Sequence, residues 1–312
     1  MSKTNQEFSF QSLLEQGAII GQVDQWVEVF WGDVRFFESE ADVDGAAIYR
    51  NDFFLQGKSP WLSYANHQRW TWSQWQEQLK TTDLGSHPDP SVAWEHPVRD
   101  DFEKTFGDII DRIKEGSLLK AVPVVYERAA KKQFQLFSVL KSSPKNTYVY
   151  GSWQKGEGVF GYTPEILFEL KDDQLSSMAL AGTCAKEVYQ KNPQQFLEDH
   201  KEQSEHHFVV DDLKDKLSTY GGLKLWPQEC LELDKLVHLY TRIQVDLKQK
   251  VSFVEFIQSL HPTSALGVFP SEQIDLLKAW RAPWSLLGAP FGLRRSDSEY
   301  LCLVGIRNIQ WD

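Results

Sequence analysis

The chain has 312 residues, and 33 Lys and Arg against 44 Asp and Glu give it a formal charge of −11. This acidic balance argues against nonspecific nucleic-acid binding, which needs a basic surface. The chain has no run of about 18 apolar residues, so no membrane span is predicted. The start carries no basic region followed by an apolar stretch, and three widely spaced cysteines are typical of a reducing compartment, so we expect a cytoplasmic protein without disulfides.

The N-terminal part of the chain is predicted to be rich in strands. Residues 17–63 mix β-branched and aromatic residues with turn residues at short intervals, and residues 70–80 read as a short helix. Residues 81–97 hold three prolines and one glycine and are predicted to be a loop. We expect residues 1–97 to form the N-terminal part of the fold and residues 98–312 its core, within one structural domain.

The remaining elements alternate between strands and a few helices. The apolar spacing predicts a helix over 100–115 that ends at Gly116, and further helices over 194–217, 252–260 and 271–281. Strands are predicted over 118–129, 133–140, 146–153, 158–162, 165–170, 176–183, 235–247 and 299–311. Strands with short connections and interspersed helices favour an α+β fold.

Two ionisable residues stand in apolar surroundings. Lys120 lies between Leu119 and Ala121, and burial there would lower its pKa toward that of a general base. Glu165 precedes the apolar run Ile166–Phe168, and burial would raise its pKa toward that of an acid. The alternatives are an edge-strand lysine with its ammonium in water and a solvated turn glutamate.

The predicted long helix places Glu202 and Glu205 three residues apart on one face, where two carboxylates repel unless a cation lies between them. The many acidic residues of this helix also fit a solvated surface. His238 lies in an apolar strand, where a histidine is more often part of the core than a ligand. Arg307 lies in another apolar strand and needs an anionic partner, from the protein or from a substrate.

Taken in order, the segments IKEGSLLKAV, FGYTPEILFEL, ALAGT, KEQSEHHFVVDDL, LVHLYTRI, LHPTSALGVFP and APFGLRRSDSEYLCLVGIR resemble the chorismate-utilising enzymes. These include isochorismate, salicylate, anthranilate and aminodeoxychorismate synthases. The resemblance covers about residues 100–311. It implies an α+β fold of two stacked antiparallel sheets wrapped by helices, with a deep cleft that holds chorismate and Mg²⁺.

The resemblance also implies a role for each singled-out residue. Lys120 would activate water for attack at ring C2, and Glu165 would protonate the departing C4 hydroxyl. Glu205, with Glu202 beside it, would contribute to the Mg²⁺ site. The remaining substrate-binding residues would be Ala181, Gly182 and Thr183 against the ring, His238 near the ring carboxylate, and Arg307 at the pyruvyl carboxylate.

Within the family, the lysine at 120 and the alanine at 181 both favour water as the nucleophile. We therefore expect isochorismate synthase chemistry, in menaquinone or siderophore biosynthesis. A salicylate synthase, which also eliminates pyruvate, is the near alternative. A chorismate-binding protein without catalysis is the second.

The sequence departs from the family pattern in three places. Pro123 interrupts the strand after Lys120 and Arg128 comes late, while Leu287 and Ala289 replace a tyrosine and a glycine. The sequence ends after the Gly-Ile-Arg strand, so the resemblance leaves the second side of the metal site unassigned, and a second polypeptide could supply it. A third hypothesis ignores the family and treats Trp61, Trp70, Trp72 and Trp75 as a carbohydrate-binding platform, against the alternative of core packing.

Overall fold

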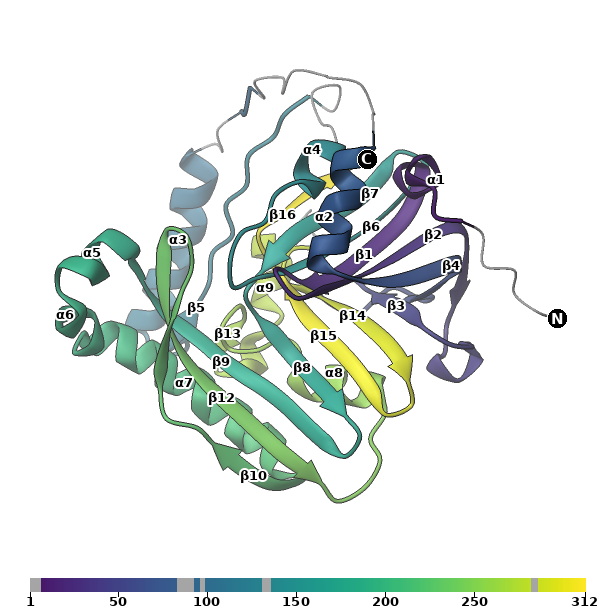
Figure 1. Cartoon of the computed structure of the whole chain (residues 1–312). Coiled ribbons are helices and arrows are strands. Elements are labelled where there is room, and N and C mark those ends of the chain that lie inside the picture. Colours follow the sequence, from purple (N-terminus) through teal and green to yellow (C-terminus); the bar gives the residue numbers. More distant parts are fainter. Residues whose placement is uncertain (1–6, 83–92, 96–98, 131–135, 282–285) are drawn as a thin grey trace.

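The computed structural model describes residues 7–82, 93–95, 99–130, 136–281 and 286–312 (Figure 1). The α-helices are α1 (Phe10–Glu15), α2 (Trp72–Thr81), α3 (Arg99–Lys114), α4 (Leu136–Leu140), α5 (Lys186–Lys191), α6 (Pro193–Leu197), α7 (His200–Ser218), α8 (Phe253–Leu260) and α9 (Leu276–Arg281). Two short 3-10 helices are η1 (Glu40–Asp42) and η3 (Ser271–Gln273).

The strands of the first half are β1 (Gln16–Gln22), β2 (Trp26–Phe37), β3 (Ala47–Arg50), β4 (Trp61–Thr71), β5 (Lys120–Ala121), β6 (Tyr148–Gln154), β7 (Glu157–Thr163) and β8 (Ile166–Lys171). Those of the second half are β9 (Gln174–Ala185), β10 (Gly221–Leu225), β11 (Glu229–Glu232), β12 (Leu236–Leu247), β13 (Val268–Phe269), β14 (Ala289–Ser296), β15 (Glu299–Gly305) and β16 (Asn308–Trp311).

Fourteen of these strands form one antiparallel sheet in the order β10-β12-β9-β8-β15-β14-β3-β4-β2-β1-β6-β7-β16, with β11 paired to β12. The sheet curves, and its two halves enclose a shared core to which β1 and β6 contribute Ile20 and Tyr150 and β14 and β15 contribute Leu293 and Leu303. The α+β class with stacked antiparallel layers is thus confirmed, although the two layers are hydrogen-bonded into a single sheet.

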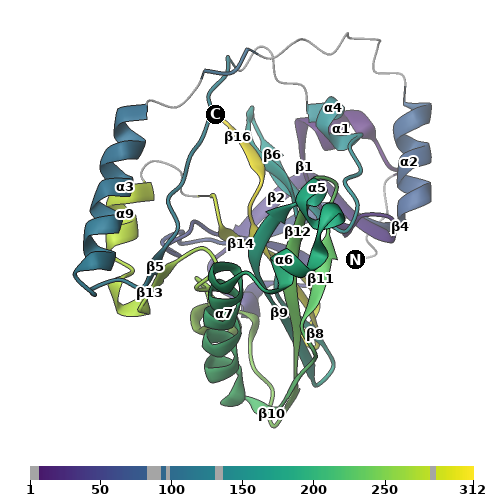
Figure 2. The ribbon, with the colours of Figure 1, turned by 90° about the vertical axis from the view of Figure 1, so that its left-hand side faces the viewer.

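A second core lies where α7 and α8 cover β8, β9 and β12, and it includes Leu213, Phe253 and Val245. Figure 2 shows α3, α9 and the β5–β13 pair gathered at one side of the molecule, with α1, α2 and α4 at the other. This arrangement brings α7, the end of β9 and the β5–β13 pair into the same region.

Several predicted elements differ from the structure. The strand predicted over 133–140 is wrong, because residues 136–140 form helix α4, while 131–135 lie outside the described residues. The strand predicted over 118–129 is limited to Lys120–Ala121, and Pro123 contributes no N–H to continue a ladder. Most of the loop predicted over 81–97 also lies outside the described residues.

Two long predicted elements are each divided into two in the structure. The helix predicted over 194–217 is two helices, α6 and α7, because the Asp199 carboxylate caps α7 by accepting from the N–H groups of Lys201 and Glu202. The strand predicted over 299–311 is divided between β15 and β16 by Arg307, whose φ of 54° lies in the left-handed region.

The carbohydrate-platform hypothesis is contradicted by burial. Trp61 and Trp75 are fully enclosed, and Trp70 and Trp72 are also buried. Trp70 and Trp75 stack on one another within the core that α2 forms with β2 and β4. Indole rings packed into a core present no face to a sugar, so core packing accounts for them.

Candidate active site

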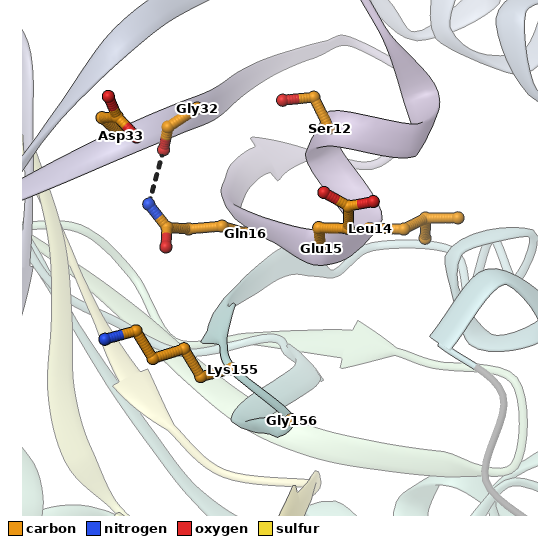
Figure 3. A pocket seen from close by; sticks show the side chains of 8 residues that line it. All are labelled: Ser12, Leu14, Glu15, Gln16, Gly32, Asp33, Lys155 and Gly156. Carbon is orange, nitrogen blue, oxygen red and sulfur yellow. Dashed lines mark hydrogen bonds between the residues drawn. The ribbon is translucent and has the colours of Figure 1, made fainter.

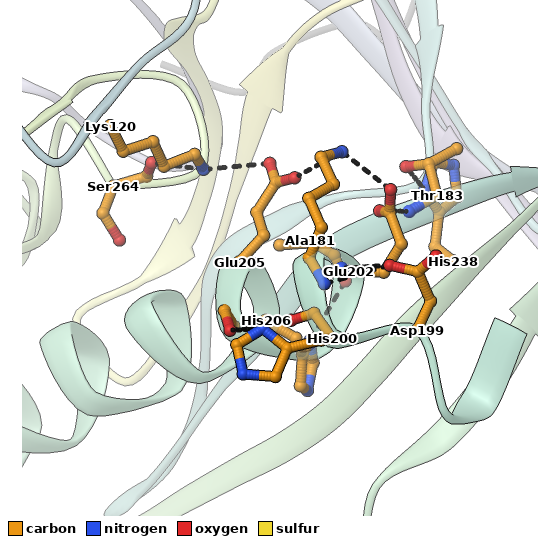
Figure 4. A network of polar contacts seen from close by, with 12 residues as sticks. Lys120, Ala181, Thr183, Asp199, His200, Glu202, Glu205, His206, His238 and Ser264 are labelled. Atoms are coloured by element: carbon orange, nitrogen blue, oxygen red, sulfur yellow. Dashed lines mark hydrogen bonds and ion pairs between the residues drawn. The ribbon is translucent and has the colours of Figure 1, made fainter. Parts of the chain in front are cut away.

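Lys120 is held with its ammonium group inside the molecule. Its strand β5 pairs with β13, and its Nζ donates to the backbone carbonyl of Ser264 at 2.8 Å (Figure 4). The Lys120 side chain is only 10% exposed, so its head does not lie in water. Burial lowers the pKa of Lys120, and the nearby carboxylates Glu205 and Glu165 oppose that lowering.

Glu205 and Glu202 on α7 continue the network from Lys120. Glu205 Oε1 lies 3.2 Å from Lys120 Nζ, and Glu205 Oε2 lies 3.4 Å from Lys201 Nζ. The same Lys201 Nζ lies 2.7 Å from Glu202 Oε1. Burial would raise the pKa of Glu205, but the charges and hydrogen bonds of Lys120 and Lys201 together lower it. The two carboxylates predicted to attract a cation therefore have an ammonium group between them.

The Ala181-Gly182-Thr183 segment at the end of β9 is anchored to α7. Glu202 Oε2 accepts from the backbone N–H of Thr183 at 2.7 Å. Gly182 has a φ of 79°, and a Cβ at this position would lie 2.9 Å from the carbonyl oxygen of Glu202. Only glycine fits such a close, left-handed approach without strain. The exposed Thr183 is thereby fixed in place with its side chain on the accessible surface.

His238 and Arg307 extend the network beyond Thr183. His238 Nδ1 lies 2.8 Å from Thr183 Oγ1, and Arg307 Nη2 donates to His238 Nε2 at 3.0 Å. Burial, followed by the charge of Arg307, lowers the pKa of His238 to about 4, against a backbone hydrogen bond to Gly182. The His238 ring is therefore neutral at physiological pH.

Glu165 is the most deeply buried carboxyl group of the site, at 4% exposure. Its backbone is fixed on both sides, because its N–H donates to Thr163 Oγ1 and its carbonyl accepts from Val304 N–H. Burial raises the pKa of Glu165 from 4.5 to about 7, although the charges of Lys120 and Arg307 act in the opposite direction. A carboxyl group with this pKa is half protonated near neutral pH and can serve as a general acid.

His206 on α7 contacts the Ala181-Gly182-Thr183 segment. It is 1% exposed, its Nδ1 lies 3.1 Å from the carbonyl oxygen of Ala181, and its Nε2 lies 2.8 Å from Thr241 Oγ1. A carbonyl can only accept, so Nδ1 carries the proton and Nε2 accepts from the Thr241 hydroxyl. This neutral histidine ties α7 to β9 and β12.

Direct contacts thus join Lys120, Glu205, Lys201, Glu202, Thr183, His238 and Arg307, and Glu165 interacts electrostatically with Lys120 and Arg307. The roles predicted for these residues stay predictions, but the fold gathers them into one place. Sequence reasoning missed Lys201, Ser264 and His206. Lys201 lies four residues before Glu205, a spacing that indicates a helical ion pair, whereas nothing in the sequence pairs Ser264 with Lys120.

One hollow lies away from these residues. A cavity of about 560 Å³ between α1, β2 and the β6–β7 turn is lined by residues that include Gln16, Asp33 and Lys155, and Gln16 donates across it to the carbonyl of Gly32 (Figure 3). None of the predicted site residues lines it. Lys120, Glu205 and His238, whose pKa values are all shifted, belong instead to the network around α7, so the chemistry of the predicted site points to that region rather than to the hollow.

In the described parts of the chain, no group of three or more His, Cys, Asp and Glu side chains is placed to hold a metal ion. Both Glu202 oxygens contact N–H groups. Glu205 Oε1 contacts Lys120, and its Oε2 contacts Lys201 at 3.4 Å, a longer distance than the 2.7 Å from Lys201 to Glu202. Because Lys201 is 74% exposed it can turn away, which would free Glu205 Oε2 for a metal ion. No helix among the described residues is long and apolar enough to cross a membrane.

Comparison with known proteins gives a consistent result. A family model described as chorismate binding enzyme matches residues 47–308. The isochorismate synthase MenF of Bacillus subtilis is 29% identical over 201 residues, which cover 60% of this chain and 42% of that protein, so the match spans less than half of the relative.

Two solved structures share the fold. The menaquinone-specific isochorismate synthase MenF of Escherichia coli superposes with a TM-score of 0.74 at 16% identity, covering 98% of this chain and 83% of that one. Anthranilate synthase component I of Streptococcus pneumoniae superposes with a TM-score of 0.66 at 12% identity, covering 99% and 87%. At these identities the likeness establishes the fold alone.

Proposed function

This chain belongs to the family of chorismate-binding enzymes, and on that premise we propose that it converts chorismate to isochorismate with water as the nucleophile and Mg²⁺ as cofactor. The observation that carries the proposal is the pair formed by Lys120 and Glu165. Burial lowers the pKa of Lys120 and raises the pKa of Glu165, so both shifts favour the neutral forms. A neutral amine can accept a proton and a neutral carboxyl group can donate one.

The proposed reaction needs one proton to be taken and one to be given. Neutral Lys120 removes a proton from water as the water oxygen forms a bond to ring C2. The ring double bonds shift, the bond between C4 and its oxygen breaks, and Glu165 protonates the leaving hydroxide to water. The substrate gains one hydroxyl group and loses one, so the step is an isomerisation.

The remaining residues would bind the substrate. Arg307 has donors beyond the one on His238, and a guanidinium group pairs well with a carboxylate such as that of the pyruvyl group. The Ala181-Gly182-Thr183 segment would lie against the ring. Because the chain carries a formal charge of −11, a dianionic substrate depends on such local cations. The predicted cytoplasmic location belongs to the same proposal.

A Mg²⁺ ion in this region would be held by Glu205, with Glu202 as the second predicted ligand. Mg²⁺ commonly binds through one or two protein carboxylates, substrate oxygens and several waters, so a single available carboxylate is compatible with it. The chemistry that the ion supplies when bound is neutralisation of a substrate carboxylate. Lys201, which now contacts both glutamates, would have to release Glu205.

The test is to incubate the purified chain with chorismate and Mg²⁺ in water enriched in ¹⁸O. We expect isochorismate that is two mass units heavier, because the hydroxyl oxygen at C2 would come from solvent. Lys120→Ala and Glu165→Gln should each reduce kcat by about 10²- to 10⁴-fold. Lys171→Ala, which removes a 63% exposed lysine that pairs with Glu169, is the matched control and should leave turnover unchanged.

Three outcomes would contradict the proposal. Release of pyruvate with salicylate would favour the salicylate synthase alternative. Chorismate binding in calorimetry without any turnover would favour a binding protein that lacks catalysis. Product that carries no ¹⁸O would exclude water as the nucleophile.

A further inference from the structure

The contact between Arg307 and His238 has a chemical consequence for Thr183. A guanidinium group has only N–H donors, so His238 Nε2, which lies 3.0 Å from Arg307 Nη2, must be an unprotonated acceptor. Burial and the adjacent cation keep the ring neutral. A neutral imidazole carries one proton, and here that proton must reside on Nδ1.

The Nδ1 proton in turn determines what Thr183 can do. Nδ1 lies 2.8 Å from Thr183 Oγ1, and the ring also makes a backbone hydrogen bond to Gly182. Because Nδ1 carries the proton, Thr183 Oγ1 can only accept in this contact. The hydroxyl proton of Thr183 then points away from His238. Among the described residues no second hydrogen-bond partner is found for this hydroxyl, and Thr183 is exposed. Its backbone is held by Glu202, whose Oε2 accepts from the Thr183 N–H.

We propose that Arg307 is a positioning residue that holds His238 in its Nδ1–H form, so that Thr183 presents a hydroxyl proton to a substrate oxygen that carries no proton. Such an acceptor is a carboxylate, a carbonyl or an ether oxygen. The second lone pair of Thr183 Oγ1 can still accept a hydrogen bond, so this arrangement favours an acceptor on the substrate without excluding a donor. This inference rests on the proposed function and specifies how the site would recognise its substrate.

The tautomer of His238 can be read by NMR without any turnover. In protein labelled with ¹⁵N at its eight histidines, spectra that correlate ring nitrogens with ring protons separate protonated from unprotonated nitrogens, and the His238→Gln variant identifies the signals of His238. We expect a protonated Nδ1 and an unprotonated Nε2 at pH 7. Arg307→Met should release Nε2 and populate its protonated form, whereas Arg307→Lys, which keeps a cationic donor, should retain more of the original tautomer.

Arg242→Met is the matched control, because it removes an exposed arginine from β12, the strand that carries His238. It should leave the His238 signals unchanged. A wild-type His238 that is protonated at Nε2 would overturn the inference, as would an Arg307→Met variant with unchanged signals.

Binding measurements test the role of Thr183. Thr183→Val should raise the Kd for chorismate at least tenfold, and Thr183→Ser, which keeps the hydroxyl group, should restore most of the affinity. In the Arg307→Met background the increase in Kd caused by Thr183→Val should be smaller by at least threefold, since Arg307 acts on Thr183 through His238. Fully additive losses of binding free energy would refute this coupling, and Arg307 would then act only through its own contact with the substrate. If the wild-type chain neither binds nor converts chorismate, the proposed function fails, while the NMR spectra still decide the tautomer.

Discussion

Replacing Glu165 with glutamine should alter stability in a pH-dependent way. Glu165 is 4% exposed, and its pKa rises from 4.5 to about 7 because burial penalises the charged form. The folded protein therefore keeps this proton at pH values where the unfolded chain has lost it. The stability associated with the neutral carboxyl group is present below about pH 4.5 and is lost as the pH rises through 7.

The size of the effect follows from the two pKa values. One pKa unit corresponds to about 1.4 kcal/mol, so full ionisation of Glu165 costs the folded state roughly 3 kcal/mol. About 1.4 kcal/mol of that cost develops between pH 6 and pH 8.5. Glutamine has nearly the same shape and never ionises. The free energy of unfolding of Glu165→Gln, relative to that of wild type, should therefore increase by that amount over this range.

Urea unfolding of both proteins at pH 6 and pH 8.5 measures this difference. Comparing the two pH values cancels any constant packing cost of the amide. Glu157→Gln, which removes an exposed carboxylate from β7, is the control and should show no such change. A relative stability of Glu165→Gln that is independent of pH would refute a raised pKa for Glu165, and with it the assignment of this residue as an acid near neutral pH.

Three further predictions concern the surrounding residues. The acidic limb of the pH profile of kcat/KM should reflect the loss of a proton from Lys120, so that activity rises as the amine becomes neutral. If the same acidic limb persisted in the residual activity of Lys120→Ala, this assignment would be excluded. His206→Ala should lower the free energy of unfolding by about 1–3 kcal/mol, because it leaves the Thr241 hydroxyl and the Ala181 carbonyl without their partner, as chemical denaturation would measure. Gly182→Ala should weaken chorismate binding, since its Cβ would meet the Glu202 carbonyl; an unchanged Kd by calorimetry would contradict the close approach.

How far the elements could be predicted depended on how local their causes were. Helix α8 and strand β12 match their predicted bounds closely, since apolar periodicity and the Ser252 cap are written in adjacent residues. The strand predicted over 133–140 was wrong, because a short apolar run can form either a strand or a helix. The break between α6 and α7 depends on one capping residue, Asp199, within an otherwise continuous helical pattern.

The family could be recognised from the sequence alone, because the ordered motifs between residues 100 and 311 are read directly from the chain, and the family match over 47–308 confirms it. It also singled out Lys120 and Glu165 as ionisable groups in apolar runs. Whether such groups are buried or solvated could not be decided from their neighbours in the chain, and the surface alternatives for both residues were excluded only by the structure.

Which groups meet, and therefore which protons they carry, depends on contacts between segments far apart in the chain. Lys120 contacts the Ser264 carbonyl, 144 positions away, and Glu205 on α7, while His238 contacts Arg307, 69 positions away. A pKa depends on burial and on charges within a few ångströms, and those neighbours come from distant segments. The residue types come from the sequence, but their protonation and hydrogen-bonding states arise only once the fold brings the β5–β13 pair, β12 and Arg307, which follows β15, together with α7.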